Sequence, residues 1–286
     1  MELAAIYSRD LSENAGFFLY AGYPGEPALG PAAFPHRPSA QHNPDSPLGH
    51  HWQDATHIAF GTATLGLRLG PIKLDGSIFT GREPDEERFG FDRPRFDSYS
   101  ARLSANPNES LSLQVSRGFL KSPEVLEAEE DVWRTTASIM HNTPLGGRGN
   151  WATTLLWGMN EIAGHDEGRS TSLLLESDLQ MGPLVFYTRL DWGQKPAHDL
   201  GLEDQFGDDR VFKIGSATLG AARDLFDFGS LKLMLGGQGI FYSVQDALEP
   251  VYGTSPISLE VFLRLSPKRT MGSGMKESED HEMHGM

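Results

Sequence analysis

The feature that most constrains this chain is an alternation of apolar and polar residues with a period of two, repeated along most of its length. Residues 257–265, for example, place Ile257, Leu259 and Val261 on one face and Ser258 and Glu260 on the other. Strict alternation of this kind is typical of a β-strand with one apolar face. A short helix is predicted only within 122–133. The alternation predicts about thirteen strands, over residues 2–8, 15–21, 55–67, 71–82, 96–104, 110–118, 131–140, 151–159, 171–180, 184–192, 211–221, 229–242 and 257–265.

The connections between these strands alternate in length. Bacterial outer-membrane barrels have short periplasmic turns and long extracellular loops, whereas a soluble β-sandwich has no reason to sort its loops in this way. The predicted fold class is therefore all-β, an antiparallel transmembrane β-barrel, with a soluble β-protein as the alternative. The short turns are 9–14, 68–70, 105–109, 143–149, 181–183 and 223–228, and the long loops are 22–54, 82–95, 119–130, 160–170, 193–210 and 243–256.

Composition excludes several other classes. No stretch approaches the ~18 consecutive apolar residues that a membrane-spanning helix needs. There is no cysteine, which suits an oxidising compartment such as the periplasm. The formal net charge of −15 argues against nucleic-acid binding. We find no nucleophile elbow, phosphate-binding glycine loop or HExxH motif, so we predict that the chain is not an enzyme. An outer-membrane hydrolase with a site at the barrel rim, or a structural sheath around a partner protein, is the alternative.

The polar faces of the predicted strands carry charges of both signs. In a large barrel such residues line a wet lumen, whereas in a soluble protein they would form the outer surface. Aromatic residues that lie near predicted strand ends are expected to form the girdles of a membrane barrel: Trp133, Trp151, Trp157, Tyr187 and Trp192. The residues predicted to line the lumen are Lys73, Asp75, Arg102, Arg134, Glu176, Asp178, Arg189, Asp191, Lys232, Glu260 and Arg264.

Loop 22–54 and the strand after it contain half of the histidines of the chain. Imidazole and carboxylate groups bind Zn²⁺, Cu²⁺ or Ni²⁺, although the spacing matches no compact zinc motif. The alternative is a loop folded over the barrel mouth, with its histidines hydrogen-bonded. Many prolines predict a stiff loop that forms a constriction or plug. The segment Gly81–Pro94 is dense in both charges and is predicted to be salt-bridged. The candidate metal ligands of the loop are His36, His42, His50, His51 and His57.

The segment after Pro267 is polar, rich in Gly and Ser, and predicted to be disordered. We therefore divide the chain into a barrel over 1–266 and a periplasmic tail over 267–286. Thioether and imidazole groups suit soft ions such as Cu(I) or Ag(I), so the tail is a candidate metal ligand, and no other cofactor is required. The candidate ligands of the tail are Met271, Met275, His281, Met283, His284 and Met286.

The directions of the first and last strands are not those of a closed antiparallel barrel. A short turn follows the first predicted strand and a long loop precedes the last, so both run towards the periplasm. The sequence therefore predicts that one or three strands are missing at the N-terminus, and that the intact barrel has sixteen or fourteen strands, as even-numbered bacterial barrels do.

Several long runs resemble a family of poorly characterised proteobacterial outer-membrane β-barrel proteins, often encoded beside copper and heavy-metal resistance systems. These runs are FLYAGYPGEPALGPAAFPHRPSA, HHWQDATHIAFG, FTGREPDEERFGFDRPRFDSYSARLSANP, GFLKSPE and NWATTLLWG. The resemblance implies an outer-membrane channel or accessory protein in copper homeostasis, embedded in lipid and served by a periplasmic metal-handling partner. Members of this family look longer than this chain at the N-terminus. This agrees with the N-terminal strands that the strand directions predict to be missing.

Overall fold

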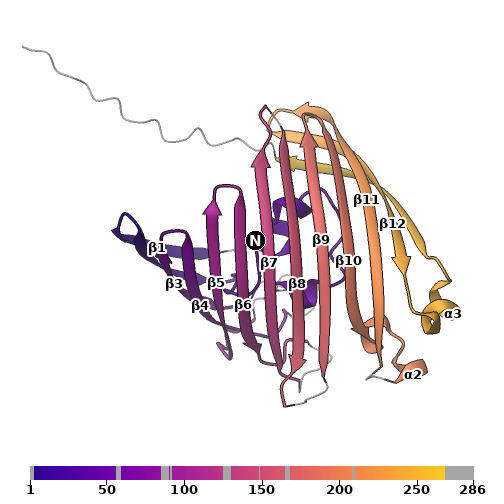
Figure 1. Ribbon diagram of the computed structural model, residues 1–286, viewed down its shortest axis with the longest axis horizontal. Helices are drawn as coiled ribbons and strands as arrows, with labels where there is room; N and C mark the ends of the chain where they lie inside the picture. Colours follow the sequence, from indigo (N-terminus) through magenta and orange to yellow (C-terminus); the bar gives the residue numbers. More distant parts are fainter. Residues whose placement is uncertain are drawn as a thin grey trace, which may run out of the picture.

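The computed structural model describes residues 3–55, 59–84, 90, 92–124, 130–147, 149–164, 168–207 and 210–267. It contains one antiparallel sheet of 13 strands, in which each strand pairs with the next along the chain (Figure 1). The predicted all-β fold is confirmed. The strands are β1 (Ala4–Ser12), β2 (Ala15–Gly22), β3 (Thr62–Leu69), β4 (Ile72–Phe79), β5 (Ser98–Asn108), β6 (Leu111–Leu120), β7 (Val132–Pro144), β8 (Asn150–Ile162), β9 (Arg169–Met181), β10 (Leu184–Pro196), β11 (Val211–Phe228), β12 (Leu231–Ser243) and β13 (Ile257–Pro267).

The lengths of the connections alternate in the structure as well. Tight turns join β3 to β4, β9 to β10 and β11 to β12, and Gly70, Gly182 and Gly229 adopt the positive φ angles that such turns require. The short helices lie in the long connections, at the opposite end of the strands or inside the sheet (Figure 1). Among the described residues, no helix is long and apolar enough to cross a membrane. The helices are η1 (Phe34–His36), η2 (Pro38–Ala40), α1 (His50–Gln53), η3 (His198–Leu200), α2 (Glu203–Phe206), η4 (Asp246–Leu248) and α3 (Glu249–Tyr252).

Most element boundaries differ by a few residues from the sequence prediction, and three differences are larger. β3 begins at Thr62 rather than at residue 55, and Ala59 before it pairs with Gly25 in an isolated bridge instead. β11 continues through the predicted turn 223–228, with a bulge between Asp224 and Phe226 that keeps it paired to β12. The helix predicted within 122–133 is wrong at its end, where Val132 and Trp133 begin β7; residues 125–129 of that range lie outside the described residues.

The sheet is polar on its concave face and apolar on its convex face. In β9, Leu173 and Leu175 point outward and are 45% and 41% exposed, whereas Leu174 and Glu176 point inward and are buried. The same outward apolar rows continue on the neighbouring strands, where Leu155 and Leu190 pair with Leu175. A soluble protein rarely exposes such a continuous apolar surface, but the lipid-facing surface of a membrane barrel requires it.

The predicted aromatic girdle is present only in part. Trp133 packs with Tyr99 and Phe119 where β5, β6 and β7 meet the long loops, and Trp151 lies at the opposite end of the sheet. Tyr187 was wrongly assigned to the girdle. Its side chain points into the interior, is 4% exposed, and donates a hydrogen bond to Gln238 (3.1 Å), because its position in β10 has the parity of the inner face.

The two edges of the sheet, β1 and β13, each pair with one neighbour in the described part of the chain. With an odd number of antiparallel strands, β1 and β13 run in the same direction. The positions of β1 are exposed on both faces, in contrast to the alternating burial of the central strands. The number of strands in a closed barrel stays a prediction.

Candidate functional site: a lumen occupied by an internal segment

Residues 23–55, which we call the plug, form the first part of the connection from β2 to β3 and lie against the concave face of the sheet. Figure 1 shows the short helices of this segment inside the curve of the sheet, behind β7 to β9. The plug is largely buried, and its Leu29 and Leu48 join small apolar clusters with residues of the sheet and the other loops. Many of its buried polar groups also form hydrogen bonds with polar groups of the strands.

The centre of the contact is a buried network of charges. Arg37 of the plug donates from Nε to Glu176 Oε1 of β9 (2.8 Å), and its Nη1 lies 3.4 Å from Asp54 Oδ2. Arg189 of β10 donates from Nε to the other oxygen of Glu176 (3.1 Å). All four side chains are almost completely buried, so each charge depends on its partners for compensation. The network therefore ties the plug to β9 and β10.

A second group of contacts lies further along the plug. His42 Nδ1 is 2.8 Å from Asp178 Oδ2 of β9. Asp45 accepts hydrogen bonds from Gln238 Nε2 of β12 on its carboxylate (2.6 Å) and from Arg189 Nη1 on its backbone oxygen (2.8 Å). The plug thus spans the concave face from the middle of the sheet towards its C-terminal strands.

The first part of the plug binds the N-terminal strands of the sheet, on the same concave face. Ala28 N–H donates to Ser77 Oγ of β4 (2.7 Å), and Gly30 N–H donates to Ser116 Oγ of β6 (2.8 Å). Arg102 of β5 donates from Nη1 to the carbonyl of Gly30 (2.8 Å). Gly30 has φ +72°, and a Cβ there would lie 2.6 Å from neighbouring plug backbone, so only glycine fits this turn.

Helix α1 packs directly on the backbone of β8. A Cβ at Gly158 would lie 2.0 Å from the carbonyl oxygen of Trp52, so the absence of a side chain there is what allows the contact. Trp52 Nε1 donates to Ser170 Oγ (2.6 Å), and Asn160 Nδ2 donates to the carbonyl of His51 (3.0 Å). The sequence signal for this contact is a single glycine within an otherwise regular strand.

The residues predicted to line the lumen all lie on strands of the sheet, and those of its central part are the most buried. Sequence reasoning missed neutral partners of the plug on the same faces, among them Ser77, Ser116, Thr154 and Gln238. Their inward parity in the alternation was the signal that could have identified them. Asp75, Arg134, Glu176, Asp178, Arg189 and Asp191 are buried, whereas Lys73, Arg102, Lys232, Glu260 and Arg264 are partly exposed.

The loop histidines have separate partners. His36 Nδ1 pairs with Glu26 (2.7 Å), His42 pairs with Asp178, and the His50 ring packs against the rings of Phe34 and His51. His57 and the predicted ligands of the tail lie outside the described residues. The copper and tail predictions therefore stay predictions.

His51 is the histidine that meets more than one carboxylate. Its Nδ1 lies 2.8 Å from Glu124 Oε1 and 3.8 Å from Glu83 Oε1. The hydrogen bond with His51 lowers the pKa of Glu124 below its ordinary value, against the opposing effect of burial. The lowered pKa favours the carboxylate form of Glu124, which can pair with a cation.

Comparisons with known proteins show the fold. Neither a family model nor a curated protein matches the sequence. The structure of Salmonella typhi OmpF in complex with daunomycin matches with a TM-score of 0.51 at 8% identity, over 93% of this chain and 89% of that chain. An anion-selective porin from Comamonas acidovorans matches over the same shares of the two chains, with a TM-score of 0.49 and 14% identity. OmpT, an outer membrane protein of Vibrio cholerae, has a TM-score of 0.46 at 5% identity, over 85% of this chain and 79% of that chain. The chain therefore has a porin-like β-barrel fold.

Proposed function

We propose that this protein is an outer-membrane channel for small polar solutes or ions, and that the plug restricts passage through its lumen. The observation that carries the proposal is the buried network of Arg37, Glu176 and Arg189, which fixes the plug across the charged concave face. The apolar convex face supports a location in lipid, and the fold shared with outer-membrane porins supports the outer membrane in particular.

The chemistry of the plug contacts favours a gate over a permanent core. The plug binds the middle of the concave face through hydrogen bonds and ion pairs, which water can replace when the plug moves. Its apolar contacts are confined to the small clusters around Leu29 and Leu48. A structural core would instead depend on apolar burial. We infer that an open state exposes the inward charges to water and lets polar solutes pass.

Single-channel conductance in planar bilayers tests this function. Gly22 and Thr62 are cross-strand partners, so a tight turn can replace residues 25–59 without separating β2 from β3. We expect the wild type to conduct weakly and the plug-deleted protein to conduct severalfold more. The matched control shortens the β8–β9 loop, 163–168, in the same way, since Glu161 and Arg169 are also partners.

Equal conductance of the wild type and the plug-deleted protein would contradict the proposal. We also propose that the chain is not an enzyme, and turnover of generic ester substrates by the wild type would favour the hydrolase alternative instead. A structural sheath would show neither conductance nor turnover.

The narrower role that we propose for the channel is in copper homeostasis, together with a periplasmic metal-handling partner. Its support is the chemistry of the tail, where thioether and imidazole groups suit Cu(I). Calorimetric titration with Cu(I) under reducing conditions tests it. We expect tight binding by the full chain and its loss when the chain ends at Pro267, and equal heats from both forms would exclude the tail as a copper ligand.

A further inference from the structure

Three segments far apart in the sequence bring one imidazole and two carboxylates together. His51 belongs to α1 of the plug, Glu83 follows β4, and Glu124 follows β6. One ligand atom from each residue lies within 4.8 Å of the other two. Among the described residues, these three side chains form a group of His, Asp or Glu close enough to hold one metal ion. The backbone hydrogen bond from Glu83 N–H to the carbonyl of Pro123 (3.0 Å) holds the two loops side by side.

The spacing of the ligand atoms suits a small divalent ion. Zinc binds histidine nitrogen and carboxylate oxygen at about 2.0–2.1 Å, so two ligands of a tetrahedral ion lie about 3.3 Å apart. The His51–Glu124 and His51–Glu83 distances, 2.8 Å and 3.8 Å, lie on either side of this value. A mixed nitrogen and oxygen donor set suits Zn²⁺ and related borderline ions better than the soft Cu(I) expected for the tail.

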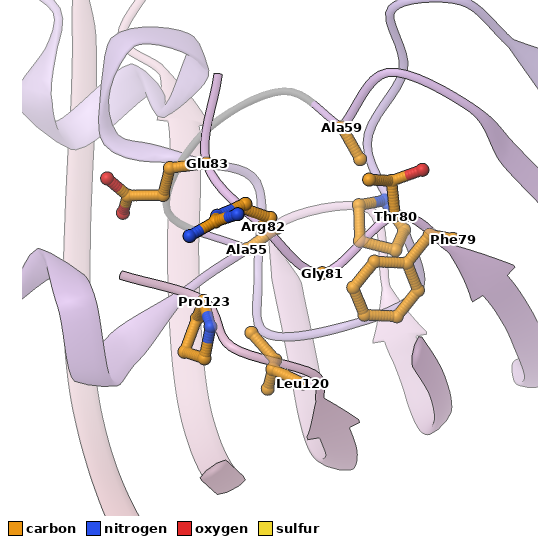
Figure 2. A pocket seen from close by; sticks show the side chains of 10 residues that line it. Ala55, Ala59, Phe79, Thr80, Gly81, Arg82, Glu83, Leu120 and Pro123 are labelled. Atoms are coloured by element: carbon orange, nitrogen blue, oxygen red, sulfur yellow. The ribbon is translucent and has the colours of Figure 1, made fainter. Parts of the chain in front are cut away.

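The surroundings leave the group accessible without exposing it fully. The side chains of His51, Glu83 and Glu124 are 23%, 23% and 33% exposed. Glu83 also lines a cavity of about 20 Å³, room for roughly one water molecule. Figure 2 shows its carboxylate at the end of that cavity away from Phe79. The buried cation Arg134 interacts with both carboxylates, but two of its nitrogens donate to Asp54 O and Asn160 Oδ1.

We propose that His51, Glu83 and Glu124 bind a divalent cation of the Zn²⁺ class at the junction between the plug and two long loops. Three protein ligands leave a tetrahedral ion one further position. The bound ion would connect α1 to the loops after β4 and β6, and so stabilise the plug in the lumen. The site does not depend on passage of any solute, nor on the copper role of the tail.

Calorimetric titration of the full chain, folded in detergent, with Zn²⁺ alone tests the proposal. We expect one ion per chain, and a loss of affinity of 10-fold or more for His51→Ala. The double variant Glu83→Gln and Glu124→Gln keeps the side-chain shapes and should lose affinity to at least the same degree. It gives a result even if the histidine variant fails to fold.

Two control variants separate this site from other ligands of the same chemistry. His36→Ala removes another imidazole of the plug that is paired with a carboxylate, and it should leave Zn²⁺ affinity unchanged. The variant with His281→Ala and His284→Ala should also bind normally. Absence of Zn²⁺ binding by the wild type, wild-type affinity in the double glutamine variant, or loss confined to the tail variant would each overturn the proposal.

Discussion

At the scale of single residues, charges on the concave face occur as partners across the boundary between plug and sheet. Glu176 of β9 accepts from Arg37 of the plug and from Arg189 of the next strand. The sequence alternation predicted that Glu176 and Arg189 face inward. It could not predict Arg37 as their partner, because that pairing joins residues 139 apart in the chain.

We expect Arg37→Met to release the plug without unfolding the sheet. The substitution leaves the carboxylates of Glu176 and Asp54 buried with less compensating charge, and removing one member of a buried pair costs about 3–5 kcal/mol. Hydrogen exchange of the plug amides measures this as a fall of that size in the free energy of plug opening. Exchange of the amides of β8 and β9 should stay slow.

The control for this prediction is His36→Ala in the same segment. His36 also pairs with a carboxylate, but its side chain is 57% exposed, and exposed pairs contribute only about 0–1 kcal/mol. Equal protection of the plug in the Arg37 variant and the His36 variant would show that the buried network does not hold the plug.

At the scale of elements, the strands were predictable because their signal is local. Each of the 13 strands overlaps a predicted strand, and the loops have the predicted order of lengths. Errors fell where a neighbour decides the outcome. β11 extends through Phe228 because β12 offers it a partner as far as Leu231, and nothing within residues 223–228 reveals that pairing.

The internal loop shows the limit of local reasoning more clearly. Its prolines predicted a stiff segment, and its histidines predicted metal ligands. Which groups would meet depends on how far the loop enters the concave side of the sheet, a property of the whole curved sheet rather than of the loop. His51 therefore reaches Glu124, 73 residues away, while His36 and His42 meet other carboxylates.

At the scale of the whole molecule, polarity is reversed relative to a soluble protein. Charged and hydroxyl side chains are buried against the plug, and large apolar side chains of the convex face are exposed. Lipid stabilises the exposed apolar rows, and the plug compensates the inward charges. The loss of stability caused by a substitution on the convex face should therefore depend on the depth of that residue in the bilayer rather than on its protein contacts.

Leu175→Arg tests this arrangement. Leu175 is the central residue of β9 and is 41% exposed on the convex face, in register with Leu155 and Leu190. Arginine on the lipid face costs about 2–4 kcal/mol at the bilayer midplane and about 0–1 kcal/mol near the interfaces. Leu184, 40% exposed at the first residue of β10, is the matched control near a strand end. Denaturant unfolding from phospholipid vesicles should show the larger loss of unfolding free energy for Leu175→Arg.

Equal losses of unfolding free energy for the two variants would mean that the middle of the convex face does not contact the hydrocarbon core. The membrane orientation argued from the apolar rows would then be wrong.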